Sequence, residues 1–174
     1  RDLVLDDSGA IRTRVSGIPA SSTTRDLVAE LEYRDPNGET QTVSNRIPLW
    51  PSRLLIGIKP DSWTASKEAF RFHVLALDLN GKPASGVQVA VELFQRRQYS
   101  HRKRLIGGFY AFEHATETKR IGPLCEGRTD AKGLLICDSK SPVSGNVILV
   151  ARAKDDSGNE TAANRDVWVA GKSE

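Results

Sequence analysis

The sequence predicts an all-β protein, an antiparallel β-sandwich built from short strands. Three observations support this prediction. Runs of about four to eight residues alternate between apolar and polar side chains and are rich in β-branched residues, a pattern typical of half-buried strands. Five Asp-x-x-Gly motifs separate these runs. No segment carries the capped apolar stripe of 3.6-residue period that is typical of a helix in a globular protein.

The Asp-x-x-Gly motifs predict tight turns. A type I turn favours Asp at its first position, where the carboxylate accepts a nearby backbone N–H, and Gly at its fourth position, where φ is often positive. We expect each motif to join two neighbouring strands as a hairpin. The motifs begin at Asp6, Asp35, Asp78, Asp130 and Asp155.

The strands of the main unit are expected in roughly seven or eight places, a number that fits two sheets packed face to face, as in immunoglobulin-like sandwiches. The expected strands lie near residues 54–58, 69–78, 87–95, 105–113, 117–126, 134–138, 147–153 and 161–169.

An internal repeat of domain size divides the chain. The segment that leads into the turn at Asp35 aligns with the segment that leads into the turn at Asp155, at an offset of 120 residues (155 minus 35). This period is too long for a solenoid unit. We therefore predict that residues 1–50 are the C-terminal portion of one sandwich domain and that residues 51–174 form a complete second domain. Two prolines, Pro48 and Pro51, mark the boundary.

A partial sandwich leaves part of its core without a partner. Apolar side chains of residues 1–50 are therefore expected to be poorly protected from solvent. These side chains are Val4, Ile11, Leu27 and Leu31.

The two cysteines flank the Asp130 turn. Folding a hairpin about Ala131 places Cys125 opposite Cys137, and opposed residues of antiparallel strands have Cα atoms about 4.5–5.5 Å apart, which a disulfide can span. We favour an intrachain disulfide, which would indicate an oxidising compartment. Two free thiols in a cytosolic protein are the alternative. A zinc site is disfavoured because it needs four ligands and only His114 is at all near.

The sequence contains no motif that predicts catalysis or cofactor binding. There is no Gly-x-Ser-x-Gly elbow, phosphate-binding loop or His-Glu-x-x-His sequence. His73 fits a half-exposed position in a strand. The acidic stretch from Asp155 to Glu160 lacks the spacing of a calcium loop. We therefore predict that the protein is not an enzyme and that it has no catalytic, cofactor-binding or metal-binding residues.

A basic cluster lies between the strands expected at 87–95 and 105–113, and we interpret it as a hairpin loop. One hypothesis is an anionic partner for this loop. The preferred interpretation is a solvated loop whose charge is offset by Glu92, Glu113 and Glu117. The net charge of the chain is only +3, so no nucleic acid is expected as a partner. The cations of the cluster are Arg96, Arg97, Arg102, Lys103 and Arg104.

Several segments of the chain together carry a resemblance to a known family. These segments are Trp50–Gly57, Gly107–Glu113, Leu124–Gly133, Leu135–Cys137 and Arg165–Gly171, while Asp35–Thr40 fits the close of the preceding domain. In their order and spacing the chain resembles the bacterial alpha-2-macroglobulin family over nearly its whole length. The resemblance implies macroglobulin-like sandwich domains in a fragment of a larger periplasmic chain, anchored to the inner membrane as a lipoprotein.

The same resemblance implies a function. The chain would be a non-catalytic scaffold module of a protease inhibitor that entraps attacking proteases after they cleave a bait region. The implied partners are neighbouring macroglobulin-like domains, target proteases reached through the parent chain, and a peptidoglycan synthase. The segment Cys125–Arg128 departs from the Cys-x-Glu-Gln sequence of a thioester, so the thioester and the bait region are expected outside this chain.

Two alternatives remain open at this point. The first is an extracellular immunoglobulin-like binding or adhesion module that uses the basic loop or the aromatic residues around Phe109. The second is an accessory sandwich of a secreted enzyme.

Overall fold

The computed structural model describes residues 2–19, 21 and 23–171. These residues form strands, turns and extended segments, with no helix and hence none long and apolar enough to span a membrane. The predicted all-β class is confirmed. Ten strands follow one another in the described residues: β1 (Arg25–Arg34), β2 (Thr40–Leu49), β3 (Leu54–Pro60), β4 (Thr64–Ser66), β5 (Phe70–Asp78), β6 (Gln88–Arg104), β7 (Tyr110–Arg128), β8 (Leu134–Ser139), β9 (Gly145–Lys154) and β10 (Glu160–Ala170).

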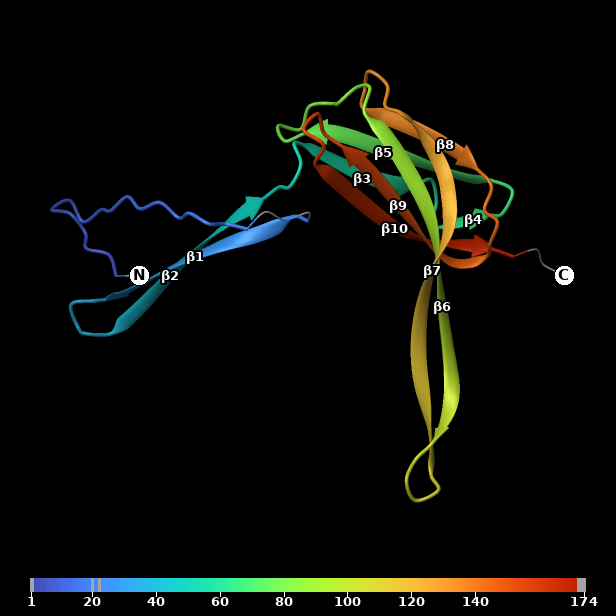
Figure 1. Ribbon diagram of the computed structural model, residues 1–174, viewed down its shortest axis with the longest axis horizontal. Coiled ribbons are helices and arrows are strands. Elements are labelled where there is room, and N and C mark those ends of the chain that lie inside the picture. The colour runs from blue at the N-terminus through green and yellow to red at the C-terminus, as the bar shows by residue number, and fades with distance from the viewer. Residues whose placement is uncertain (1, 20, 22, 172–174) are drawn as a thin grey trace.

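Strands β3 to β10 build a sandwich of two sheets (Figure 1). One sheet has the order β4-β10-β9-β6-β7 and the other the order β3-β5-β8. All neighbours are antiparallel except β4 and β10, which run parallel. The predicted sandwich is confirmed. Strand β4 was not predicted, because three residues are too few to show an alternating pattern.

The core lies between the two sheets and is built from alternate positions of the strands. In β5 the side chains of Phe70, Phe72 and Val74 are buried. Arg71 and Leu75, at intervening positions of the same strand, are exposed. Strands β6, β9 and β10 repeat this alternation from the opposite sheet. Each large apolar side chain that leaves water in this way contributes about 1.5–3 kcal/mol.

All five Asp-x-x-Gly motifs form the predicted turn, with one shared geometry. The Gly N–H donates to the Asp backbone oxygen, and the Asp N–H donates to the carbonyl oxygen four residues later. The Asp Oδ1 atom accepts hydrogen bonds from the backbone N–H groups two and four residues ahead. The Gly φ values lie between 73° and 84°, where glycine is favoured over other residues.

The expectation that every turn joins two paired strands is confirmed at only two of the five positions, since no strand flanks the turn at Asp6 within residues 2–19. The turns at Asp35 and Asp155 join paired strands, β1 to β2 and β9 to β10. The turns at Asp78 and Asp130 instead carry the chain from one sheet to the other, from β5 to β6 and from β7 to β8. The two crossings are tied together by the buried Thr129, whose hydroxyl accepts from Val87 N and donates to Ala84 O.

The N-terminal hairpin repeats the last hairpin of the sandwich. Arg25 pairs with Leu49 in β1–β2, and Gly145 pairs with Val169 in β9–β10, so the pairing register is the same at the offset of 120 residues. Most positions that are buried in β9 and β10 are solvent-facing in β1 and β2, where only Leu27 and Leu49 of this set are half-buried, and this hairpin stands apart from the sandwich (Figure 1).

The expected exposure of the first fifty residues is largely observed. Val4, Ile11 and Leu31 are exposed, whereas Leu27 is half-buried. The domain boundary proposed near Pro51 stays a prediction.

Asp155 makes contacts that the other four turn aspartates lack. Its Oδ2 atom accepts from the backbone N–H of Arg53 at 2.9 Å and from the hydroxyl of the buried Ser52 at 3.3 Å. These bonds fasten the β9–β10 turn to the segment just before β3. The Arg53 N–H, helped by the N–H groups of the turn, lowers the pKa of Asp155 from 3.8 to about 2.

Gly133 is predicted to tolerate alanine far less well than Gly158. Both glycines have positive φ, which costs a non-glycine residue about 1–2 kcal/mol. A Cβ atom at Gly133 would also collide with the backbone oxygen of Ala76, whereas a Cβ at Gly158 meets nothing within 4 Å. We expect Gly133→Ala to cost at least about 3 kcal/mol and Gly158→Ala about 1 kcal/mol in urea unfolding. Equal losses would contradict the assigned crossing geometry.

Asp155→Asn is predicted to lower stability at neutral pH and to make little difference in strong acid. The pKa of Asp155 is depressed in the folded state, so its stabilisation is present above 3.8 and is lost as the pH falls toward about 2. Thermal unfolding from pH 7 to pH 2 should show the two proteins converging over that window. Asp35→Asn serves as the control, because Asp35 accepts bonds only within its own turn. A constant difference between wild type and Asp155→Asn at every pH would contradict the assignment.

Candidate functional site

Strands β6 and β7 continue beyond the sandwich as a two-stranded arm. Strand β9 pairs with β6 only from Val89 to Gln95, while β7 pairs with β6 as far as Arg104. We call residues 96–118 the arm. It projects away from both sheets and ends in a turn at residues 105–109 (Figure 1).

The interpretation of the basic cluster as a loop is therefore wrong. Its residues belong to β6, and the two strands expected at 105–113 and 117–126 are a turn followed by one strand, β7. The sequence signal fails here for a physical reason. Both faces of the arm meet water, so no face of its strands needs a regular set of apolar side chains.

The arm has two faces with different chemistry. Residues directly opposed on antiparallel strands share a face, and the register of β6 and β7 assigns every position. The outer face continues the solvent side of the five-stranded sheet and the inner face continues its core side. The outer face carries Arg96, Gln98, Ser100, Arg102, Arg104, Tyr110, Phe112, His114, Thr116 and Thr118, and the inner face carries Arg97, Tyr99, His101, Lys103, Ala111, Glu113, Ala115 and Glu117.

The carboxylates of the arm lie only on the inner face. Glu113 contacts Lys103 at 3.2 Å and His101 at 3.5 Å, and Glu117 lies opposite Arg97. Glu92, which was expected to offset the basic cluster, instead pairs with Arg120, whose guanidinium lowers the pKa of Glu92. The charge is thus balanced on the inner face alone.

The outer face combines cations with aromatic rings. The guanidinium of Arg102 lies 4.2 Å from the centre of the Tyr110 ring, a cation–π contact that holds both side chains in place. Arg96, at the root of the arm, pairs with Asp166 of β10 at 3.3 Å. Tyr110 and Phe112 are two positions apart in β7 and therefore share a face, and the register places them on the face of Arg102 and Arg104.

The tip of the arm is apolar and open to solvent. Phe109 is 74% exposed, Phe112 is 68% exposed, and Ile106 is fully exposed. Exposed apolar clusters of this kind often mark contact sites. The tip and the outer face together are the strongest candidate for a binding surface in the described residues.

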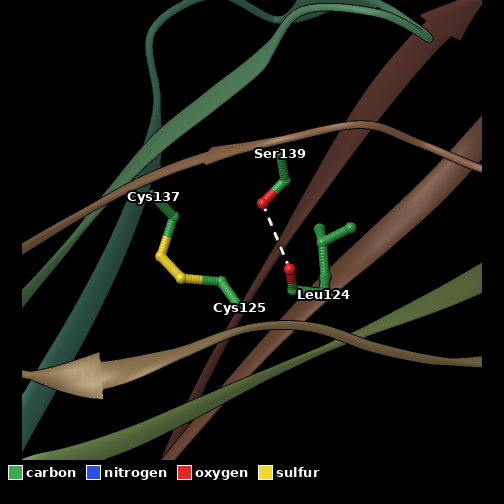
Figure 2. Close-up of a disulfide and its surroundings, with 4 residues drawn as sticks. All are labelled: Leu124, Cys125, Cys137 and Ser139. Atoms are coloured by element: carbon green, nitrogen blue, oxygen red, sulfur yellow. Dashed lines mark hydrogen bonds between the residues drawn. A yellow bond between two sulfur atoms is a disulfide. The ribbon is translucent and has the colours of Figure 1, made fainter.

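The predicted disulfide joins Cys125 of β7 to Cys137 of β8, with the Cα atoms 6.1 Å apart (Figure 2). The expected hairpin between these strands is wrong, because β8 pairs with β5 and β7 pairs with β6. The bridge therefore links the two sheets. The hydroxyl of Ser139 donates to the carbonyl oxygen of Leu124 at 3.1 Å beside it and adds a second link.

Two titratable side chains of β5 are engaged in ion pairs. His73 is half-buried in β5, as expected, and its Nε2 lies 2.7 Å from Asp61. Arg71 forms a two-pronged pair with Asp138, which lowers the pKa of that carboxyl group. Within the ranges that the structure describes, no group of three or more His, Cys, Asp or Glu side chains could hold a metal ion.

Reduction of the disulfide is predicted to lower the free energy of unfolding by about 3 kcal/mol, since the bridge closes a short loop of the unfolded chain. Urea unfolding with and without reductant measures this loss. The double variant Cys125→Ser/Cys137→Ser is the control, and its stability should not respond to reductant. Intact mass after alkylation of the non-reduced protein should show no modified cysteine. Free alkylation of both thiols would contradict the bridge.

The fold is similar to segments of bacterial alpha-2-macroglobulins. The native conformation of E. coli alpha-2-macroglobulin matches 97% of this chain with a TM-score of 0.66 at 14% sequence identity. Salmonella alpha-2-macroglobulin reacted with methylamine matches 86% with a TM-score of 0.58 at 12% identity. The chain spans only 11% and 10% of those proteins. No protein-family model and no curated protein sequence matches it. The chain therefore has the fold of a segment of a bacterial alpha-2-macroglobulin, and the resemblance predicted from its sequence is confirmed at the level of the fold.

Proposed function

We propose that this chain is a non-catalytic scaffold module of a larger alpha-2-macroglobulin-like protein that entraps proteases. The observation that carries the proposal is the structural match to E. coli alpha-2-macroglobulin, which extends over 97% of the chain and so includes both the N-terminal hairpin and the sandwich. Because the match covers nearly the whole chain, the two proteins share the order of the strands along the chain as well as the fold of one domain.

The equal register of the two hairpins supports a tandem arrangement of domains. The apolar face of β1–β2 includes Leu31, paired with Val43. At the offset of 120 residues, Leu31 corresponds to Ala151, which is fully buried in the sandwich. We infer that residues 1–50 close a preceding sandwich, whose second sheet would cover this face. The module would then act through contacts between neighbouring domains.

The disulfide supports an oxidising compartment such as the periplasm. Anchoring of the parent protein to the inner membrane as a lipoprotein is part of the proposal. A contact with a peptidoglycan synthase has no support in the fold, and the proposal does not include it.

Protease entrapment by the parent protein is tested with substrates of two sizes. The parent protein is incubated with elastase or trypsin, and the remaining activity is measured on a short chromogenic peptide and on a large protein. We expect the trapped protease to cleave the peptide and to lose access to the protein, because entrapment encloses the protease without filling its active site. The chain of 174 residues alone should affect neither reaction. Loss of both activities, or of neither, with the parent protein would overturn the proposal.

A further inference from the structure

The arm exposes an open strand edge on β6. From Val89 to Gln95, β6 lies between β9 and β7, and beyond Gln95 only β7 remains beside it. The side of β6 that faces β9 within the sandwich therefore has no partner strand along the arm, among the residues that the structure describes. A strand edge of this kind presents unpaired backbone N–H and C=O groups, which can pair with another extended chain.

The register shows which backbone groups point to the open edge. The N–H of Leu105 donates to the carbonyl oxygen of Phe109 at 2.7 Å, so these two residues form a hydrogen-bonded pair. Such pairs alternate with non-hydrogen-bonded pairs along an antiparallel ribbon. The backbone groups at Arg104, Arg102, Ser100 and Gln98 therefore point away from β7 and toward the open edge.

The charges along this edge are all positive. Between Arg96 and Arg104, β6 carries cations on both of its faces and no carboxylate. The acidic side chains Glu113 and Glu117 are on β7, the strand farther from the edge. Cations on an exposed edge repel a second copy of the same strand. They are complementary to a strand that carries carboxylates.

The sandwich provides an entrance to the open edge. A hollow lies where β9 begins and the arm departs, lined by Gln95, Arg97, Tyr99, Asn146 and Trp168 among others. The side chain of Gln95 donates to the carbonyl oxygen of Ser144 at 2.8 Å and fixes the start of β9. A chain that followed the line of β9 onto the arm would pass through this hollow, beside the half-exposed Trp168.

We propose that the open edge of β6, from Gln98 to Arg104, binds an extended acidic segment of a partner polypeptide as an added strand. The added strand would hydrogen-bond to the outward-pointing backbone groups and place its carboxylates beside Arg102, Lys103 and Arg104. It would also turn a two-stranded ribbon into a three-stranded sheet, which is more stable in water. This interaction does not depend on protease entrapment by the parent protein.

Binding of a synthetic acidic peptide to the whole chain tests the proposal. The probe is a short fluorescent peptide in which Glu alternates with Thr, and its Lys–Thr counterpart is the control. We expect saturable binding of the Glu peptide alone, measured by fluorescence anisotropy. We also expect slower amide hydrogen exchange at residues 98–104, without a comparable change at residues 110–118.

A matched pair of substitutions at Ser100 separates strand addition from charge attraction. Ser100→Pro removes one outward-pointing N–H and leaves every charge in place. Ser100→Ala keeps that N–H. We expect the proline variant to bind the Glu peptide at least about tenfold more weakly, and the alanine variant to bind within about twofold of wild type.

Two further variants keep the test decisive if proline disturbs the arm. A Glu–Thr peptide that is N-methylated at every residue has no free N–H on either edge, cannot form a strand ladder and should not bind the unchanged protein. The variant Arg102→Gln/Lys103→Gln/Arg104→Gln keeps the edge and should lose most of the affinity. The proposal is overturned if the N-methylated peptide binds as well as its parent peptide, if the Lys–Thr peptide binds equally, or if heparin or single-stranded DNA binds more tightly than the Glu peptide.

Discussion

Each Asp-x-x-Gly turn depends on the two hydrogen bonds that one Asp oxygen accepts from backbone N–H groups just ahead of it. A chain of short strands must reverse or change sheets repeatedly, and each turn leaves backbone donors without a partner in a strand ladder. The carboxylate satisfies two of these donors within the turn, and the glycine with positive φ lets the chain leave it. Four such turns connect strands of the described chain, so both sheets rely on this local interaction.

The sequence predicts those parts of the fold in which one face of a strand is buried. The alternation in β5 and β9 follows from packing against the core, and their bounds agree with expectation to within two residues. The turns are equally predictable, because Asp and Gly act within a few residues of each other. The same turn can close a hairpin or cross between sheets, however, and distant contacts such as those of Thr129 decide between these outcomes.

The candidate site was harder to predict than the core. The disulfide pairing was identified because the two cysteines lie close in sequence, although its place between the sheets depends on the crossing at Asp130. The sequence identifies the basic residues of the cluster as a group. Their division between two faces follows once they belong to one strand, and the register of β6 and β7 decides which residues of β7 share each face. One face therefore carries Arg102 beside Tyr110, and the other carries Lys103 beside Glu113. The net charge of the cluster says nothing about this difference between the faces.

The disulfide divides the exposed basic sites of the sandwich and arm into two classes. Arg128 and Lys132 lie inside the covalent ring that runs from Cys125 to Cys137. A protein nicked after either residue would remain one molecule, with its two sheets still cross-linked. A nick in the arm after Arg104 lies outside the ring and would leave two fragments joined only by strand pairing and packing. After treatment with a trypsin-like enzyme, cleavage outside the ring would therefore give two separate fragments on a non-reducing denaturing gel. Cleavage inside the ring would give two fragments only after reduction.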